Sequence, residues 1–158
     1  MGRFVGIEEL LALRRSLKNE GKRVVFTNGC FDILHRGHVE YLTKARALGD
    51  VLIVGVNSDE SVTRLKGPGR PIVEQEDRAV VVAALAAVDY VCLFNEDTPF
   101  ELIKHVVPDV LVKGADWNVE DVIGKDIVER AGGSVQTIDF LPSRSTTGLI
   151  ERIRSRRP

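Results

Sequence analysis

The sequence predicts a doubly wound α/β fold, in which helices cover both faces of a parallel sheet. Short segments rich in apolar and β-branched residues alternate along the chain with stretches of helical length and pattern. Several of the short segments are apolar throughout, as in strands that are covered on both faces. Strands that alternate with helices in this way are joined by right-handed crossovers and run parallel.

The first expected element is an extra helix that precedes the sheet. Leucines at 10, 11, 13 and 17 give residues 7–19 an apolar face at helical spacing, and Glu20-Gly21 ends the helix. The runs of β-forming residues then predict strands at 24–27, 51–56, 90–94, 110–112 and 134–138. The stretches between them predict helices at 38–48, 59–65, 76–87, 99–105 and 125–130. A last helix is expected at 147–154, with Ser145 or Thr146 as its N-cap.

The composition is that of an ordinary globular chain. Its 158 residues fit one domain, and 44% of them are apolar and 28% charged. The net charge of −1 gives no reason to expect nucleic acid or a membrane as a partner. Arginines at 152, 154, 156 and 157 are expected to form a solvated helix end. With no long apolar run and two unspaced cysteines, the sequence predicts a cytoplasmic protein with free thiols.

The most informative motif is TNGCFDILHRGH at residues 27–38. An apolar strand leads into a glycine-containing turn and, as we expect, straight into a helix. Helix N-termini carry unpaired N–H groups and a partial positive charge, and the i, i+3 spacing puts His35 and His38 on one face. Zinc would require two further ligands, and only His105 and two isolated cysteines remain. The motif therefore predicts a polyphosphate site and no metal held by the protein.

Chain order also predicts where this site lies. In doubly wound sheets, ligands bind beyond the carboxyl ends of the strands, at the point where strand order reverses. The strand at 24–27 ends at the histidine motif, and the strand at 110–112 ends at Lys113-Gly114. We expect the two ends to meet at one crevice.

The histidine motif and five further segments resemble the D-glycero-β-D-manno-heptose 1-phosphate adenylyltransferases, a family of the HxGH cytidylyltransferase-like superfamily. The further segments are VGVNSD at 54–59, RLKGPGRP at 64–71, EDTP at 96–99, PDVLVKG at 108–114 and STT at 145–147. The resemblance covers about residues 20–153. It implies a Rossmann-like nucleotidyltransferase fold over a single domain, residues 1–158. It also implies transfer of AMP from ATP to D-glycero-D-manno-heptose 1-phosphate, giving ADP-heptose and pyrophosphate for lipopolysaccharide or other surface heptose.

Other functions remain open at this point. A cytidylyltransferase acting on glycerol 3-phosphate or a related polyol phosphate is the first alternative, and adenylyl transfer to flavin mononucleotide is another. A non-catalytic nucleotide sensor on the same fold is a third. For the adenylyltransferase, the resemblance implies a homodimer, and Mg²⁺ is expected on the ATP phosphates with few protein ligands. The sequence shows no kinase segment, so a separate heptose kinase is expected to supply the sugar phosphate.

Adenylyl transfer assigns roles to the residues of these motifs. A phosphate oxygen is a competent nucleophile, so the protein must supply positioning and positive charge rather than a strong base. By resemblance, His35 and His38 bind the phosphates and stabilise the transition state. Lys66 lies in a Gly/Pro loop that can close over a ligand, and is expected to neutralise phosphate charge. Arg70 in the same loop is either a second phosphate contact or a solvated residue.

The remaining candidates surround the nucleotide. Backbone amides of the turn Asn28, Gly29, Cys30 and Phe31 are expected to face phosphate, and a lowered thiol pKa is possible for Cys30 at a helix N-terminus. Arg78 is read as a phosphate contact or as a surface arginine paired with Glu74 or Asp77, and Lys113 as a crevice residue or a solvated strand end. By resemblance, Gly114, Asp116 and Trp117 hold the base and ribose, and Ser145, Thr146 and Thr147 the phosphates, with Arg144 beside them. Asp32 and Asp50 are expected either to orient a histidine or to anchor a turn.

Overall fold

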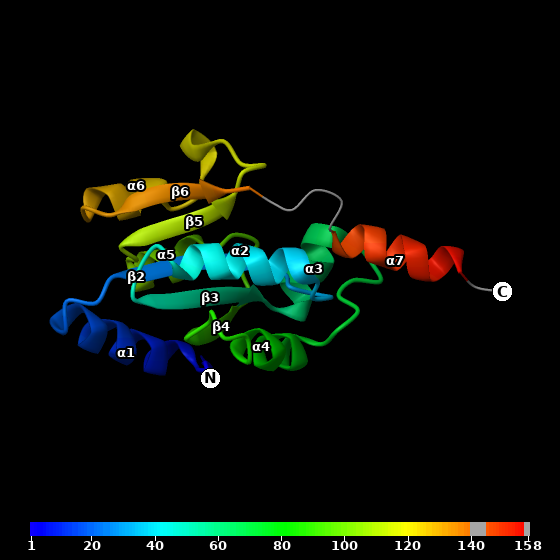
Figure 1. Ribbon diagram of the computed structural model, residues 1–158, viewed down its shortest axis with the longest axis horizontal. Helices are drawn as coiled ribbons and strands as arrows, with labels where there is room; N and C mark the ends of the chain where they lie inside the picture. The colour runs from blue at the N-terminus through cyan, green and yellow to red at the C-terminus, as the bar shows by residue number, and fades with distance from the viewer. Residues whose placement is uncertain (140–144, 157–158) are drawn as a thin grey trace.

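Within residues 1–139 and 145–156, which the computed structural model describes, six parallel strands form one sheet (Figure 1). Their order across the sheet is β1-β4-β3-β2-β5-β6. The strands are β1 (Arg3–Phe4), β2 (Val24–Gly29), β3 (Val51–Asn57), β4 (Tyr90–Phe94), β5 (Val110–Gly114) and β6 (Ser134–Ile138). The chain moves from β2 outward to β4 and then crosses to β5 on the other side of β2. Strand order therefore reverses between β2 and β5.

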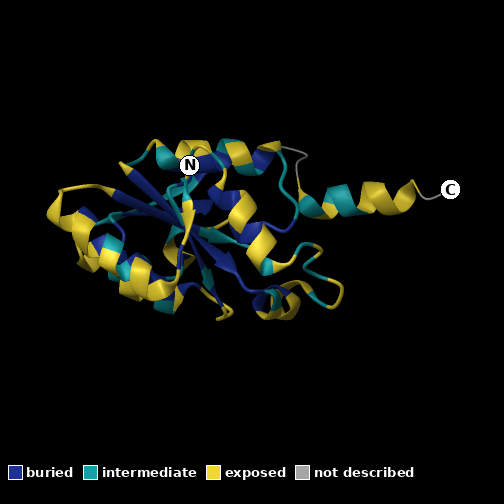
Figure 2. Ribbon diagram, turned by 90° about the horizontal axis from the view of Figure 1, so that it is seen from below, coloured by how far each residue is buried: buried dark blue, intermediate teal, exposed yellow. Residues whose placement is uncertain are grey.

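Helices cover both faces of this sheet. They are α1 (Ile7–Asn19), α2 (Arg36–Arg46), α3 (Asp59–Lys66), α4 (Gln75–Ala83), α5 (Phe100–Val106), α6 (Lys125–Arg130) and α7 (Thr146–Ser155), with a 3₁₀ turn at Val119–Asp121. One buried cluster joins Val25 to side chains of α2 and α4, and another joins Val24 and Phe26 to side chains of α1, α5 and α6. Alternate residues of β2 thus pack into two separate hydrophobic cores, one on each face of the sheet. Figure 2 shows the buried strands between helices whose outer faces are exposed. The predicted doubly wound α/β fold is confirmed.

The element boundaries follow the predictions with a few differences. The helices at 7–19 and 125–130 and the strands at 90–94 and 134–138 have the predicted limits. β2 and β5 each extend two residues beyond prediction, because Gly29 still pairs with Val56, and Gly114 with Ile138, after the apolar run has ended. α4 ends at Ala83, so the predicted helix at 76–87 was too long. The short edge strand β1 was not predicted; its two residues pair with Tyr90 and Val91.

The last helix, α7, differs from the others in its packing. It extends away from the sheet at the right of Figure 1, and none of its residues is buried. Ser145 is its N-cap, as predicted, with Oγ accepting a hydrogen bond from the Gly148 N–H at 3.0 Å. Among the described helices, none is long and apolar enough to cross a membrane.

Candidate functional site

A cleft of about 710 Å³ opens at the carboxyl ends of β2 and β5. Most of the residues predicted for the site line it: Asn28, Gly29, Cys30, Phe31, His35, His38, Lys66, Lys113, Trp117, Ser145, Thr146 and Thr147. Asn28 at the end of β2 accepts a hydrogen bond from the Lys113 ammonium at the end of β5. The prediction that these two strand ends meet at one crevice is confirmed.

A tight turn, residues 29–32, forms the floor beside β2; we call it the glycine turn. A side chain at Gly29 would place its Cβ only 3.0 Å from the ring of Phe31, so any larger residue would require the ring to shift by a few tenths of an ångström. Phe31 itself is buried and has φ of 48°, in the left-handed region that few non-glycine residues adopt. The chain then needs three more residues before α2 begins at Arg36, so the strand does not lead straight into the helix as predicted.

The two histidines lie at the first turn of α2. His35 is the N-cap residue, and the His35 N–H donates to Nδ1 of His38 at 3.4 Å. The two imidazole rings are stacked, with centroids 3.9 Å apart, and the Phe31 ring lies 5.3 Å from that of His38. Since Nδ1 of His38 accepts a hydrogen bond, neutral His38 carries its proton on Nε2. That N–H is then a donor for a ligand in the cleft.

Burial sets the charge of His38. Desolvation, with a smaller contribution from the positive charge of His35, lowers the pKa of His38 to about 4. His38 is therefore uncharged at neutral pH in the free protein. In this state it can donate a hydrogen bond from Nε2, and the cations that line the cleft are Lys66, Arg70 and Lys113.

One wall of the cleft is formed by the end of α3 and the segment after it, residues 66–73, which we call the lysine loop. Lys66 is the last residue of α3 and is exposed toward the cleft. Gly67 and Gly69 have φ of 88° and 85°, which allows the chain to reverse direction here. Arg70 lines the cleft and is not solvated: its Nε donates to Asp32 at 2.5 Å. The lysine loop thus presents two cations to the cleft.

The third cation of the cleft lies near the end of β5. Lys113 is only 8% exposed, and burial lowers its pKa to about 8, although nearby Asp116 opposes this shift. Its ammonium lies 5.5 Å from the centre of the Trp117 ring, within the range of a cation–π contact. The alternative of a solvated strand end is therefore wrong for Lys113. Trp117 is 43% exposed and lines the cleft instead of packing in a core.

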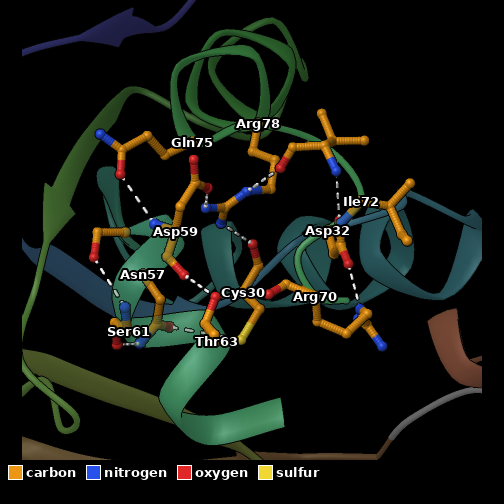
Figure 3. Close-up of polar contacts among 12 residues, drawn as sticks. Cys30, Asp32, Asn57, Asp59, Ser61, Thr63, Arg70, Ile72, Gln75 and Arg78 are labelled. Carbon is orange, nitrogen blue, oxygen red and sulfur yellow. Dashed lines mark hydrogen bonds and ion pairs between the residues drawn. The ribbon is translucent and has the colours of Figure 1, made fainter. Parts of the chain in front are cut away.

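Three predicted binding residues are not among the described residues that line the cleft: Arg78, Gly114 and Asp116. Gly114 is buried within β5 and Asp116 is exposed. Arg78 is 1% exposed, and its guanidinium donates to the carbonyls of Val73 and Cys30 and to the Asp59 carboxylate (Figure 3). Both readings of Arg78 are therefore corrected: it is neither a surface arginine paired with Glu74 or Asp77 nor placed to touch a phosphate.

The acidic candidates anchor turns. Asp32 accepts from the Ile72 and Val73 N–H groups at 2.7 and 2.9 Å, in addition to Arg70. Asp50 accepts from the Arg23 N–H at 2.8 Å. Of the two roles considered, turn anchoring is the one that their contacts show. Burial raises the pKa of the Cys30 thiol, so the lowered pKa considered for this residue was wrong.

Ser145, Thr146 and Thr147, at the N-terminus of α7, also line the cleft. Thr146 Oγ1 donates to the Ile33 carbonyl at 3.2 Å, which joins this segment to the chain just before the histidines. Arg144, considered as a neighbour of this segment, lies outside the described residues.

Sequence reasoning missed part of the lining: Asn57, Leu65, Asp97, Thr98, Pro99 and Ile123. Asn57 ends β3, and Asp97 to Pro99 follow β4. Applying the strand-end rule to every strand, and not only to β2 and β5, would have found these four residues. Leu65 lies in the segment 64–71 that carries the family resemblance, and no comparable signal marks Ile123.

The charges of the cleft favour a polyanion. Lys66, Arg70 and Lys113 line the same cleft as the two histidines. The two carboxylates in the lining are engaged by arginines: Asp32 by Arg70, and Asp97 by Arg64 at 2.6 Å. Among the described residues, no group of three or more His, Cys, Asp or Glu side chains is placed to hold a metal ion. The arrangement can bind several linked phosphates and stabilise negative charge that develops between them.

A family model described as cytidylyltransferase-like matches residues 26–144 of the chain. Two curated relatives, each called "Bifunctional protein HldE", come from Nitratiruptor sp. and Syntrophotalea carbinolica. They are 60% and 56% identical over 148 and 153 residues, which are 94% and 92% of this chain. The chain spans 31% of the length of each of these relatives.

Solved structures are similar as well. A lipopolysaccharide core biosynthesis protein from Thermoplasma volcanium is 30% identical, with a TM-score of 0.63 over 77% of this chain and 98% of the other. A pantoate-β-alanine ligase from Francisella tularensis has the same TM-score at 15% identity, over 93% and 69% of the two chains. The second likeness concerns the fold alone.

Proposed function

This chain belongs to the cytidylyltransferase-like family of nucleotidyltransferases, and we propose that it transfers AMP from ATP to D-glycero-D-manno-heptose 1-phosphate. The products are ADP-heptose and pyrophosphate, for lipopolysaccharide or another heptose-containing surface glycan. The heptose assignment is supported by the sequence segments that resemble heptose 1-phosphate adenylyltransferases and by the HldE relatives. The similar protein from Thermoplasma volcanium is named for lipopolysaccharide core biosynthesis, which agrees with the proposed use of the product.

One observation carries the proposed chemistry: a neutral histidine donor, His38, lines the same cleft as three cations, Lys66, Arg70 and Lys113. An oxygen of the sugar phosphate attacks the α-phosphorus of ATP, and the bond from that phosphorus to the β-phosphate bridging oxygen breaks. Pyrophosphate leaves, and no base is needed because the attacking phosphate is already ionised. His35 and His38 are the donors for the α-phosphate and the bridging oxygen. Lys66, with Arg70 beside it, neutralises the departing pyrophosphate.

The nucleoside lies toward Trp117 in this proposal. Trp117 lines the cleft beside Lys113, and Trp117 and Ile123 both offer apolar surface to a base. Ser145 to Thr147 line the same cleft and are proposed to contact the nucleotide phosphates. Mg²⁺ is proposed to arrive on the ATP phosphates, because its preferred oxygen ligands are then supplied by phosphate and water.

The biological setting completes the proposal. A heptose kinase activity must supply the sugar 1-phosphate. The curated relatives are called bifunctional and are about three times as long as this chain. The kinase should therefore be sought both on the same polypeptide and on a separate protein. The enzyme is proposed to act in the cytoplasm, where ATP is available, and as a homodimer.

The proposed reaction is tested by a matrix of pyrophosphate-release assays. ATP and CTP are each combined with both anomers of heptose 1-phosphate, with glycerol 3-phosphate and with flavin mononucleotide. Turnover with ATP and one heptose anomer is expected. Turnover with CTP and glycerol 3-phosphate would identify the cytidylyltransferase alternative, and ATP binding without pyrophosphate release from any pair would indicate a nucleotide sensor.

Lys113→Met is expected to stabilise the protein while weakening ATP binding. At pH 7 the wild type keeps a desolvated ammonium whose pKa is lowered to about 8, so removing the charge should raise Tm by at least about 3 °C. In the wild type this penalty disappears as the pH rises from about 8 to the ordinary value of 10.5, so its free energy of unfolding should rise in that window. The variant should lack that rise. Thermal melts and ATP titrations over this pH range are the measurement.

Wild-type affinity for ATP is also expected to fall as the pH passes about 8, because the ammonium loses its charge. Lys113→Met should remove this step. A variant that melts at a lower temperature and binds ATP as the wild type does would contradict both parts of the prediction.

A further inference from the structure

We propose that Asp32 and Arg78 are positioning residues for the proposed reaction. They hold the lysine loop against the glycine turn, so that the loop cations and the histidines face the same polyphosphate. The two segments are far apart in sequence but meet in the structure, where Figure 3 shows Asp32 of the glycine turn in contact with the lysine loop and Arg78 in contact with both segments. This inference rests on the proposed function for its kinetic consequences, while its effect on ATP affinity can be measured without an acceptor.

Asp32 fastens the lysine loop from the side of the glycine turn. Its side chain has no exposed surface, although the residue forms part of the cleft wall. Oδ1 accepts from the Ile72 and Val73 N–H groups, and Oδ2 accepts from Arg70 Nε at 2.5 Å. A buried carboxylate with three donors cannot also bind a phosphate, which would repel it. The role open to Asp32 is to fix the path of the loop and the direction of Arg70.

Arg78 fastens the same two segments from α4 and adds a third. Its Nε donates to the Val73 carbonyl at 2.8 Å, Nη1 to the Cys30 carbonyl at 2.6 Å, and Nη2 to Asp59 Oδ1 at 2.7 Å. The three acceptors lie in the lysine loop, the glycine turn and the first residue of α3. A planar guanidinium can reach three fixed acceptors at once, whereas a lysine ammonium is a point charge on a flexible stem.

The backbone between the two fastened positions is strained. Phe31, with φ of 48°, lies between Cys30, whose carbonyl Arg78 holds, and Asp32, whose carboxylate holds the loop. Residues in such sparsely populated conformations persist where the surrounding structure over-determines them. The contacts of Asp32 and Arg78 provide that constraint at the turn that supplies backbone amides to the cleft.

The same contacts reach Lys66 indirectly. Arg78 holds Asp59 at the start of α3, and Lys66 is the last residue of that helix. At the other end, Thr63 Oγ1 donates to the Arg70 carbonyl at 2.8 Å, which ties α3 to the loop. Loss of either fastener should therefore displace Lys66 and Arg70 together, without removing any group that touches a ligand.

Arg78→Lys tests the proposal, with Arg14→Lys as its matched control. Arg14 is also buried and donates to two carbonyls, those of Val106 and Val107, and to Asp109, but it is not among the residues that line the cleft. Arg78→Lys is expected to lower kcat by about 10²-fold, the effect of a small misplacement of catalytic groups, and to weaken ATP binding about 10-fold. Arg14→Lys should keep both quantities within about threefold at a comparable loss of Tm. Equal losses of activity in the two variants would overturn the proposal.

Asp32→Asn is the second test and keeps the proposal falsifiable if Arg78→Lys does not fold. The amide oxygen of the new side chain can still accept from the two loop N–H groups. The amide NH₂ group would then face the Arg70 guanidinium, and because both groups are donors, the hydrogen bond to Arg70 is lost. We expect kcat to fall about 10-fold. Asp109→Asn is the control, since Asp109 likewise accepts from a backbone N–H and from an arginine, away from the cleft. A loss of kcat in Asp109→Asn equal to that in Asp32→Asn would overturn the proposal.

A double-mutant cycle separates positioning from a general structural effect. If Asp32 acts through Arg70, Asp32→Asn should cause no further loss of kcat in an Arg70→Ala background. Full additivity of the two losses in kcat would overturn this route.

ATP affinity, measured without acceptor, distinguishes failure of the positioning proposal from failure of the proposed function. If the wild type binds ATP but releases no pyrophosphate with any acceptor, the proposed function fails. A selective loss of ATP affinity in Arg78→Lys would still support positioning in that case. Unchanged ATP affinity and unchanged kcat in Arg78→Lys would refute positioning alone.

Discussion

Replacing His38 with alanine is expected to lower kcat for adenylyl transfer by about 10²–10³-fold, and His35→Ala by a similar factor. Both rings line the cleft, and His38 offers Nε2–H to a ligand because its Nδ1 is engaged by the His35 N–H. A donor that acts where charge develops on the bridging oxygen affects kcat more than KM. Pyrophosphate release at saturating ATP and sugar phosphate gives the measurement.

The third histidine supplies the control for these variants. His105 is exposed on α5 and is not among the residues that line the cleft, so His105→Ala should leave kcat unchanged. Melting temperatures of all three variants should stay close to that of the wild type. Near-normal kcat in both His35→Ala and His38→Ala would remove the histidines from the mechanism.

The pH profile distinguishes a neutral from a charged His38. Since the pKa of His38 is lowered to about 4, the free protein carries it uncharged over the range from about pH 5.5 to 7. The dependence of kcat/KM on pH, which reports groups of the free enzyme, should therefore show no decline from His38 as the pH rises through this range. If kcat/KM of the wild type fell tenfold per pH unit in this range, and that fall were absent from His38→Ala, the imidazolium form of His38 would be required.

Lys66→Ala is expected to lower kcat/KM by about 10²-fold with little change in Tm. The side chain is exposed toward the cleft at the end of α3, so its loss removes charge from the proposed pyrophosphate site and disturbs no core packing. Lys66→Arg, which keeps the charge, should recover part of the activity. The measurement is the initial rate of pyrophosphate release over a range of ATP concentrations, combined with a thermal melt.

Lys44→Ala is the matched control for this variant. Lys44 is exposed on α2 and is not among the residues that line the cleft, so its replacement should change neither kcat/KM nor Tm. A fall of Tm by many degrees in Lys66→Ala would favour a structural role for Lys66, and an unchanged kcat/KM would exclude it from phosphate binding.

The sequence predicts the architecture well because hydrophobic burial determines it. The apolar run of β3, all of it buried, and the leucine pattern of α1 both follow from covering a sheet on two faces. Strand ends are less predictable, because Asn28-Gly29 and Lys113-Gly114 stay in the ladder through backbone hydrogen bonds that apolar pattern does not report. β1 is two residues long and leaves no pattern to detect.

The site residues divide along a similar line. Those adjacent to strand ends, such as Asn28 and Lys113, are predictable because parallel topology brings strand ends together. Arg78 was misjudged because an arginine near the start of a helix has the same local sequence whether it faces solvent or lies buried between two loops. Its three acceptors come from segments 5, 19 and 48 residues away, and only the tertiary structure brings them together. The neutral state of His38 likewise depends on burial that no local motif reports.

The pairing of β2 with β5 has a consequence for how the protein folds. Asn28 and Lys113, which are hydrogen-bonded in the cleft, are separated by 85 residues, so bringing this pair together carries the entropic cost of closing a long loop. Contacts of such long range slow folding, and no early, locally structured intermediate can contain the complete cleft. A nucleotide that contacts both strand ends would therefore bind the native state and not a partly folded one. At 100 times its dissociation constant such a ligand would raise the free energy of unfolding by about 2.7 kcal/mol, so the substrate would also stabilise the native state.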